Sequence, residues 1–273
     1  MESSTIQRED FAWLCQMLRD ETAIVVDAAK AYLVEARLLP LARSKGMPVA
    51  ELIRRARADT RAEKERRQVI EAMTTNETSF FRDRRIFDSI TDQVVGRVLE
   101  EQKGEIRIWC AAASTGQEPY SLAMALASRY PSDQSRVRIV ASDIDTQALA
   151  RARLAEYSQL ELSRGLPSCM KKYFDRQGDR WRIRQEIREM VEFRQLNLVK
   201  PWPSVARMDL VLVRNVLIYF EPKVKAEILT RMARKVLPTG FIILGSTESA
   251  LGCDVPLRAQ KIGQCTVYSR TAS

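Results

Sequence analysis

The feature that most constrains the fold is a short apolar run that ends in small residues and opens into an amphipathic pattern. Residues 108–113 read Ile-Trp-Cys-Ala-Ala-Ala, and Ser-Thr-Gly-Gln-Glu-Pro follows them. Ser and Thr are typical of a helix entry, and Glu-Pro is typical of a first helical turn. We therefore predict a strand, a tight turn at Gly116 and a helix. Junctions of this kind, at the carboxyl end of a strand, bind nucleotide-like ligands in α/β sheets.

The same junction argues against two common phosphate sites. No lysine follows Gly116, so the segment is not a P-loop, and the Gly-x-Gly-x-x-Gly pattern is also missing. Glu118 lies in the turn. Its carboxylate favours a ligand with hydroxyl groups or a cationic end over one with phosphates.

Strands and helices are predicted to alternate after residue 105. The expected strands are 105–111, 136–141, 190–195, 209–213, 240–245 and 264–269, and the expected helices are 118–129, 146–156 and 222–236. Alternation of this kind is typical of a mostly parallel, Rossmann-like α/β sheet with helices on both faces. We expect the last two strands to form an antiparallel edge.

Two other regions depart from this alternation. Residues 1–72 have helical spacing of apolar residues and are predicted to form an all-helical domain. Residues 73–90 are expected to be a linker, and 91–273 the sheet domain. Within it, a Gln-Gly-Asp turn between two short alternating segments predicts a small antiparallel β insertion at about 161–190.

Composition narrows the chemistry. The chain of 273 residues has no histidine, which excludes Ser-His and Cys-His nucleophile pairs. Its five cysteines are scattered, so we expect buried free thiols and no metal site. The N-terminus lacks a signal peptide and no run is apolar enough for a membrane helix. We therefore expect a cytoplasmic protein without membrane insertion.

The charge favours an acidic partner. The formal net charge is +9, which suits nucleic acid, an anionic surface or an acidic protein. Residues 54–67 hold seven basic and three acidic side chains, and Arg54, Arg57 and Arg61 fall on one side of the predicted helix. Two interpretations are open at this point: a solvated helix face, or a docking face.

Polar residues end two further strands. Asp143 follows the strand 136–141, where a carboxylate can accept bonds from the two hydroxyls of a ribose. Asp145 is expected to cap the next helix. Arg214 and Asn215 follow the strand 209–213, and Tyr219 lies just beyond.

Four ordered segments carry a resemblance. They are Asn-Glu-Thr-Ser-Phe-Phe-Arg, Ala-Ser-Thr-Gly-Gln-Glu-Pro-Tyr-Ser, Ala-Ser-Asp-Ile-Asp and Arg-Asn-Val-Leu-Ile-Tyr-Phe. From about residue 10 to 270 the chain resembles the CheR-type chemotaxis receptor methyltransferases. The resemblance implies transfer of a methyl group from S-adenosylmethionine (SAM) to glutamates on the cytoplasmic signalling helices of chemoreceptors, with S-adenosylhomocysteine (SAH) as the product.

The resemblance also implies site residues. The cofactor contacts carried over by motif are Asn76, Thr78, Arg82, Glu118, Asp143, Asn197, Leu198, Arg214 and Asn215. Arg82, Arg214 and Tyr219 resemble the residues near the methyl-transfer point. Because the receptor segment is acidic, Arg54, Arg55, Arg57 and Arg61 resemble a docking face.

The implied chemistry agrees with the composition. A glutamate is already ionised near neutral pH, so methyl transfer to it needs no general base and no histidine. The enzyme's main contribution is positioning, and Arg82 or Arg214 could orient the carboxylate.

Two alternatives differ in class. The net charge of +9 suits a nucleic-acid methyltransferase, but an Asn-Pro-Pro-Tyr junction and aromatics within the basic run are missing. A cofactor-sensing scaffold without turnover is disfavoured by the intact Arg82, Asp143 and Tyr219. We expect a monomer that does not bind nucleic acid. Because the turn of the β insertion is short, we also expect a member of the family that does not bind a pentapeptide at the receptor tail.

Overall fold

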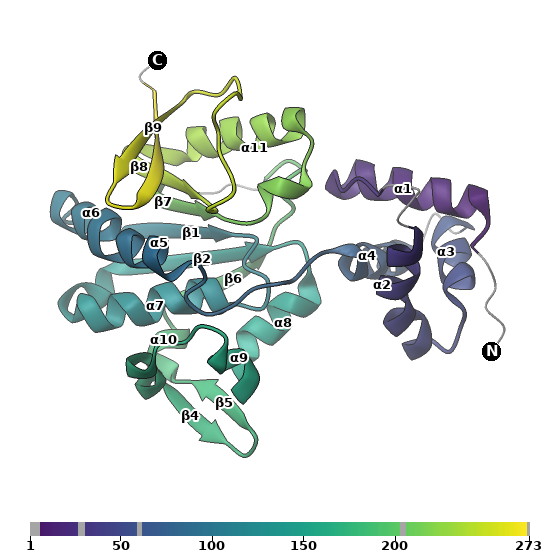
Figure 1. Cartoon of the computed structure of the whole chain (residues 1–273), viewed down its shortest axis with the longest axis horizontal. Helices are drawn as coiled ribbons and strands as arrows, with labels where there is room; N and C mark the ends of the chain where they lie inside the picture. Colours follow the sequence, from purple (N-terminus) through teal and green to yellow (C-terminus); the bar gives the residue numbers. More distant parts are fainter. Residues whose placement is uncertain (1–5, 27–30, 59–61, 203–205, 272–273) are drawn as a thin grey trace. The chain divides into compact units, whose positions relative to one another are not determined.

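The computed structural model describes residues 6–26, 31–58, 62–202 and 206–271 (Figure 1). The chain forms two compact units. One comprises residues 1–75 with the short segments 197–201 and 219–221, and the other comprises the remaining residues.

The first unit is helical. Its helices are α1 (Arg8–Thr22), α2 (Ala31–Ser44), α3 (Val49–Ala58) and α4 (Glu63–Met73). Apolar side chains three or four positions apart point inward from each helix, because that spacing places them on one face. The core of this unit contains Leu14, Leu18, Val34, Leu38, Leu52, Ile53 and Val69, all fully buried.

The second unit is built on a seven-stranded sheet. Its strands are β1 (Ile106–Ala111), β2 (Val137–Asp143), β6 (Val191–Gln195), β7 (Met208–Val213), β8 (Val236–Leu244), β9 (Leu257–Ile262) and β10 (Cys265–Arg270). The order is β6-β2-β1-β7-β8-β10-β9, in which the first five strands are parallel and the last two pair antiparallel. The order reverses between β1 and β7, and the carboxyl ends of strands at such a switch point form a ligand crevice.

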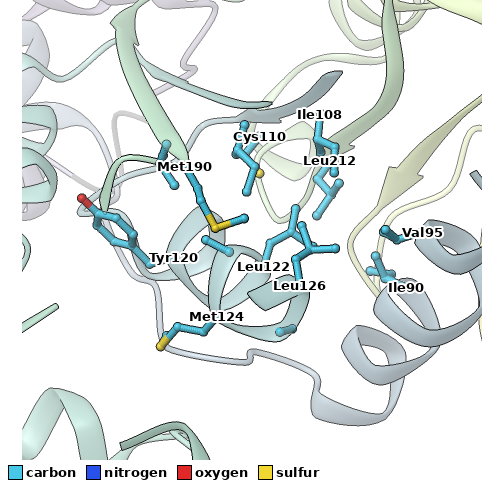
Figure 2. Close-up of a cluster of buried hydrophobic side chains, with 14 of the residues drawn as sticks. Ile90, Val95, Ile108, Cys110, Tyr120, Leu122, Met124, Leu126, Met190 and Leu212 are labelled. Atoms are coloured by element: carbon cyan, nitrogen blue, oxygen red, sulfur yellow. The ribbon is translucent and has the colours of Figure 1, made fainter. Parts of the chain in front are cut away.

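Alternating side chains of the sheet build two apolar layers. Ile108, Cys110 and Leu212 join one core with helices α5 (Arg84–Ser89), α6 (Gly96–Glu101) and α7 (Gln117–Arg129) and the π-helix η2 (Ile90–Val95). Figure 2 shows these three side chains together with labelled residues of α7 and η2. On the other face, Trp109 packs edge-on against Trp202 at a centroid distance of 5.1 Å. Helix α11 (Pro222–Lys235) supplies Arg231, whose guanidinium lies 4.7 Å from the Trp202 ring centroid.

A small antiparallel sheet and the connecting helices complete the unit. The sheet has the order β3-β5-β4, from β3 (Glu156–Ser158), β4 (Phe174–Gln177) and β5 (Arg180–Ile183). Gly178 turns between β4 and β5 with φ +62°, which favours glycine. The connecting helices are α8 (Thr146–Leu154), α9 (Gln159–Ser163), α10 (Gln185–Arg188), η3 (Pro131–Arg136), η4 (Ser168–Tyr173) and η5 (Leu217–Tyr219).

The predicted fold class is confirmed, but several details were wrong. Strand β9 was not predicted, because its sequence Leu-Arg-Ala-Gln-Lys-Ile has no apolar run. The edge of the sheet is formed by β9 and not by β10. The helix predicted to reach residue 156 ends at Leu154, since Ala155 adopts a left-handed conformation with φ 55°. Of the five cysteines, only Cys110 and Cys265 are buried, while Cys169 is exposed. None of the described helices has the length and apolar character needed to span a membrane.

Candidate functional site

The loop after β1 has the predicted tight turn, and its backbone is unusual. Ala112, Ser114 and Gly116 have φ values of 57°, 51° and 94° before α7 begins at Gln117. A Cβ on Gly116 would lie 2.9 Å from the Ala152 Cβ and 3.1 Å from the Tyr157 hydroxyl. Glycine is therefore required both by conformation and by space. The loop brings backbone N–H groups to the switch point of the sheet.

Asp143 holds this loop to the end of β2. Its Oδ2 accepts the N–H of Ser114 at 2.7 Å, and its Oδ1 accepts the N–H of Asp145 at 2.9 Å. Burial raises the pKa of the Asp143 carboxyl, and the two backbone N–H groups oppose that rise. Each oxygen has a second lone pair. The carboxylate therefore shapes the loop while retaining acceptor capacity for the two hydroxyls that the sequence predicted.

Asp145 and Asn76 tie a third segment to these two strand ends. Asp145 caps α8 as predicted, since its Oδ1 accepts the N–H groups of Gln147 and Ala148 at 2.8 and 3.0 Å. Its Oδ2 accepts the Asn76 side-chain amide at 2.6 Å. The Ser114 hydroxyl donates to the Asn76 carbonyl at 3.0 Å. The Asn-Glu-Thr-Ser segment is thus anchored beside both β1 and β2.

Two phenylalanines anchor the other end of that segment. Phe80 is fully buried, and its ring centroid lies 4.9 Å from that of Tyr157. Phe81 is buried too, and its backbone N–H donates to the Ser121 hydroxyl of α7 at 3.0 Å. Thr78 and Arg82, on either side of this pair, are only half-buried. The segment therefore presents these two polar side chains from a rigid support.

Arg214 is enclosed by acids at the end of β7. Its side chain is 0% exposed; Nη1 donates to Glu118 at 2.7 Å, and Nη2 donates to Asp83 at 3.0 Å and to the Arg82 carbonyl at 3.1 Å. Nε of Arg214 has no hydrogen-bond partner in the described part of the chain. Asp83 was missed by the sequence analysis. The signal that could have found it is its place directly after the Asn-Glu-Thr-Ser-Phe-Phe-Arg motif.

Glu118 is the second acid of this cluster. Burial raises the pKa of the Glu118 carboxyl, and the charge of Arg214 opposes the rise. Its Oε2 accepts the Arg214 bond, whereas Oε1 has no hydrogen bond from any residue that the structure describes. The switch point thus offers a carboxylate oxygen next to a neutralised arginine, which suits a cationic group of a ligand better than a phosphate.

The structure groups three predicted residues with the helical unit. Asn197, Leu198 and Tyr219 belong to its segments 197–201 and 219–221. The Asn197 side-chain amide donates to the Glu21 carbonyl at 2.7 Å, and its Oδ1 accepts the Val199 N–H at 2.9 Å. The other seven predicted cofactor contacts belong to the sheet unit: Asn76, Thr78, Arg82, Glu118, Asp143, Arg214 and Asn215.

The predicted docking arginines do not form one free face. Arg57 pairs with the buried Asp10 of α1 at 2.9 Å and so links α3 to α1, which was not expected. Arg54 and Arg55 both pair with Glu51 and stay exposed, at 54% and 61% of their side-chain surface. Arg61 lies outside the described residues.

Comparison with known proteins decides the family. The sequence profile of the CheR methyltransferase SAM binding domain matches residues 76–264, and that of the CheR methyltransferase all-alpha domain matches residues 9–74. The chain belongs to the CheR methyltransferase family. The predicted resemblance is therefore confirmed, and the sheet unit is a SAM-binding methyltransferase domain.

Curated relatives of this CheR protein agree along nearly the whole chain. Chemotaxis protein methyltransferase 1 of Pseudomonas aeruginosa is 39% identical, over 88% of this chain and 90% of its own length. Chemotaxis protein methyltransferase Cher2 of Pseudomonas putida is 37% identical, over 89% and 91%. The chemotaxis protein methyltransferase of Vibrio parahaemolyticus is 36% identical, over 92% and 93%.

The residues at the switch point fit SAM. This cofactor carries a cationic sulfonium, an ammonium group and a ribose with two hydroxyls. Glu118 presents a carboxylate oxygen to which no described residue donates, and Asp143 retains acceptor capacity for hydroxyls. The buried Arg214 is paired with both Glu118 and Asp83, which neutralise its charge. The charge of this CheR site therefore suits a cationic nucleoside.

Proposed function

We propose that this protein transfers a methyl group from SAM to glutamate side chains on the cytoplasmic signalling helices of chemoreceptors, and so tunes sensory adaptation. Membership of the CheR family supports the reaction class, and the names of the relatives support chemotaxis. The observation that carries the proposal is the acid-lined switch point, where Glu118 and Arg214 form a buried pair in a chain without histidine.

The chemistry needs positioning more than acid–base groups. When bound, SAM would supply a methyl group on a positively charged sulfonium, from which the neutral thioether SAH is an excellent leaving group. A bond forms between a glutamate oxygen and the methyl carbon while the carbon–sulfur bond breaks, and no proton moves. The glutamate is ionised near neutral pH, so the chain must orient it and exclude water. This explains how a protein without histidine can catalyse the reaction.

The hydrogen bonds of Arg214 and Arg82 support a different role for each of them. Arg214 is fully buried and donates to Glu118 and Asp83, so its guanidinium is already occupied. Arg82 is half-buried, and its Nη1 donates only to the Glu77 carbonyl, at 3.2 Å, among the described residues. We infer that Arg82 orients the substrate carboxylate and that Arg214 holds Glu118 in place. Tyr219 is the third residue proposed near the transfer point.

The remaining cofactor contacts are proposals of the same kind. They are Asn76, Thr78, Asp143, Asn197, Leu198 and Asn215. Asp143 is assigned to the ribose, because it ends the second strand and keeps acceptor capacity there. The division into a docking domain (1–72), a linker (73–90) and a methyltransferase domain (91–273) belongs to the same proposal.

Partners follow from charge. Receptor signalling segments that carry glutamates are acidic, and Arg54 and Arg55 are exposed on α3. We propose that these two side chains contact the receptor. We also propose that the enzyme is a monomer and that it works in the cytoplasm. A receptor-tail pentapeptide is not part of the proposal, because only Gly178 and Asp179 connect β4 and β5. That connection leaves little backbone for an incoming strand.

Transfer of radiolabelled methyl groups tests the proposal. The full chain is incubated with labelled SAM and either cytoplasmic fragments of chemoreceptors from the same cell or total RNA. Label that appears on a receptor fragment and is released by mild base, as expected of a methyl ester, supports the proposal. Label on RNA, or no label on any receptor fragment, contradicts it.

A further inference from the structure

A glutamate outside the predicted site accepts hydrogen bonds from three backbone N–H groups, two after β7 and one after β8. Glu248 lies in the turn after β8. Its Oε2 accepts the N–H of Asn215 at 2.7 Å and of Gly245 at 2.8 Å, and its Oε1 accepts the N–H of Ile218 at 3.2 Å. A carboxylate is an acceptor-only group, and N–H bonds to a charged acceptor are stronger than neutral ones. The contact joins residues about 30 positions apart in the chain.

The β7 loop needs such an acceptor. Asn215 is in the left-handed region with φ 58°, and η5 begins two residues later. In this conformation the N–H groups of Asn215 and Ile218 lie outside the ladders of the sheet. Asn215 is half-buried, and a backbone N–H that is removed from water must find a partner, which Glu248 supplies. Ile218 is exposed, so its N–H does not depend on this acceptor in the same way. The carboxylate therefore stabilises the conformation in which Arg214 and Asn215 leave the sheet.

Gly245 allows the carboxylate to approach. A Cβ at this position would lie 2.7 Å from Glu248 Oε2 and 2.9 Å from both the backbone nitrogen and the side-chain nitrogen of Asn215. Two of these three neighbours belong to Asn215 itself. Any side chain at residue 245 would therefore have to displace the Glu248 carboxylate, Asn215 or both, which provides a second way to disturb the same contact.

The turn after β8 also reaches the acids around Arg214. The Ser246 hydroxyl donates to Asp83 Oδ2 at 3.1 Å, and Arg214 Nη2 donates to the same oxygen at 3.0 Å. Burial is the main cause of the raised pKa of Glu118, and the negative charge of Glu248 adds to it. The turn thus contacts the Arg214–Asn215 segment from two sides, once through the backbone and once through Asp83.

We propose that Glu248 is a positioning residue for methyl transfer. It does not touch the cofactor. It fixes the Arg214–Asn215 segment, and it lets Arg214 hold Glu118 in the geometry that the cofactor requires. This inference rests on the proposed function in one respect: Arg214, Asn215 and Glu118 are taken to form part of the SAM site.

Substitutions of Glu248 separate positioning from mere stability. Glu248→Ala removes all three acceptor bonds. Glu248→Gln keeps an amide oxygen that can still accept from Asn215 and Gly245, but it turns an NH2 group toward the Ile218 N–H. Gly245→Ala leaves the carboxylate chemically intact but crowds its contact with Asn215. We therefore expect graded effects, with glutamine between the wild type and alanine.

Two control variants match these changes. Thr247→Ala alters the same turn at an exposed side chain, for which no hydrogen bond is found in the described ranges. Ser158→Ala removes the side-chain cap of α9, in which the Ser158 hydroxyl accepts the Glu161 N–H at 3.3 Å. It destabilises the sheet unit at a place unrelated to the β7 loop.

The experiment measures SAH binding to the full chain by calorimetry and the kinetics of receptor-fragment methylation, with melting temperatures in parallel. We expect Glu248→Ala and Gly245→Ala to weaken SAH binding about tenfold, and Glu248→Gln to weaken it about threefold, in line with the loss of one or a few hydrogen bonds. The apparent kcat/KM for SAM should fall in the same order. Both control variants should bind SAH like the wild type.

The inference is overturned if Glu248→Ala lowers the melting temperature but binds SAH and methylates receptor with wild-type constants, or if glutamine is no better than alanine. If Glu248→Ala does not fold, Glu248→Gln and Gly245→Ala decide the matter by the same criteria. A wild type that binds SAH but labels no receptor fragment contradicts the proposed function instead, and the SAH affinities of the variants still test Glu248.

Discussion

The guanidinium of Arg214 is fully buried, and it donates a 2.7 Å hydrogen bond to the carboxylate of Glu118. The two residues come from different strand ends, Arg214 from β7 and Glu118 from the first turn of α7 after β1. Their bond therefore crosses the switch point at which the sheet order reverses. A site for a positively charged cofactor can include a buried arginine only because its charge is neutralised in this way.

Removing Arg214 should destabilise the sheet unit strongly. Arg214→Ala leaves Glu118, whose side chain is only 14% exposed, without its cation, and breaking one side of a mostly buried pair costs about 3 kcal/mol. Arg97→Ala is the matched control, because Arg97 makes an exposed pair with Glu101 and such pairs contribute less than about 1 kcal/mol. Urea unfolding monitored by circular dichroism measures both. An Arg214→Ala variant as stable as Arg97→Ala would show that the buried pair is not important for stability.

The raised pKa of Glu118 predicts how its contribution to stability depends on pH. A carboxyl whose pKa is higher in the folded than in the unfolded chain favours folding most at low pH. This contribution is lost as the pH rises from about 4.3, the ordinary glutamate pKa, through the raised value in the folded protein. The affinity for SAH should instead increase as the pH rises through this range, because the cationic group of SAH needs the ionised carboxylate.

Glu118→Gln isolates this effect, since glutamine does not titrate while all other groups stay. As the pH rises from about 4.3 through the raised pKa, the unfolding free energy of the wild type should fall relative to that of the variant. A difference that is constant with pH, or that moves in favour of the wild type, would mean that the Glu118 pKa is not raised.

Asp143 should be important for both loop conformation and cofactor affinity. Asp143→Ala removes the acceptor of the Ser114 and Asp145 N–H groups. With Asp143 assigned to the ribose as proposed, the substitution also leaves two ribose hydroxyls unpaired. We expect a loss of roughly 1–3 kcal/mol in binding, or about 5- to 150-fold in SAH affinity. Asp143→Asn keeps one acceptor oxygen and should lose less. Calorimetry on variants with native circular dichroism tests this, and unchanged affinity would remove Asp143 from the site.

The arginines of α3 should separate into two groups. Arg54 and Arg55 pair only with Glu51 of their own helix among the described residues, so their double substitution by Glu should slow receptor methylation several-fold and reduce its salt dependence. SAH affinity should not change. Arg57→Ala should instead lower the stability of the helical unit, because Arg57 partners the buried Asp10. Arg194→Glu, at an exposed side chain of β6, is a charge-reversal control for the methylation rates. Equal rates for the double variant and this control would contradict the docking role.

Local patterns account for what the sequence predicted well. Apolar runs placed the parallel strands, the Ser-Thr-Gly turn placed the start of α7, and the position of Asp145 before α8 identified its cap. Each of these depends on neighbours a few residues apart, so periodicity and capping preferences reveal them. Strand β9 was missed because it is polar on its exposed positions, and its place at the edge removes the need for an apolar run.

Contacts between distant residues could not be predicted in the same way. The partners of Arg214 lie about 100 or more positions away, and Glu248 reaches Asn215 across 33 positions. Nothing in the local sequence marks Arg57 as the partner of Asp10, so a helical projection alone placed it on a free face. Such pairings arise from the order of the strands and the packing of helices.

The most direct test of the central claim is to locate the methyl group on the product. Receptor cytoplasmic fragments are treated with the full chain and SAM, digested, and analysed by peptide mass spectrometry, with Asp143→Ala as the enzyme control. We predict a mass increase of one methylene on specific glutamate side chains, reversed by mild base and strongly reduced with the variant. Modification at any other residue type, or glutamate methylation that is equally fast with Asp143→Ala, would contradict the account.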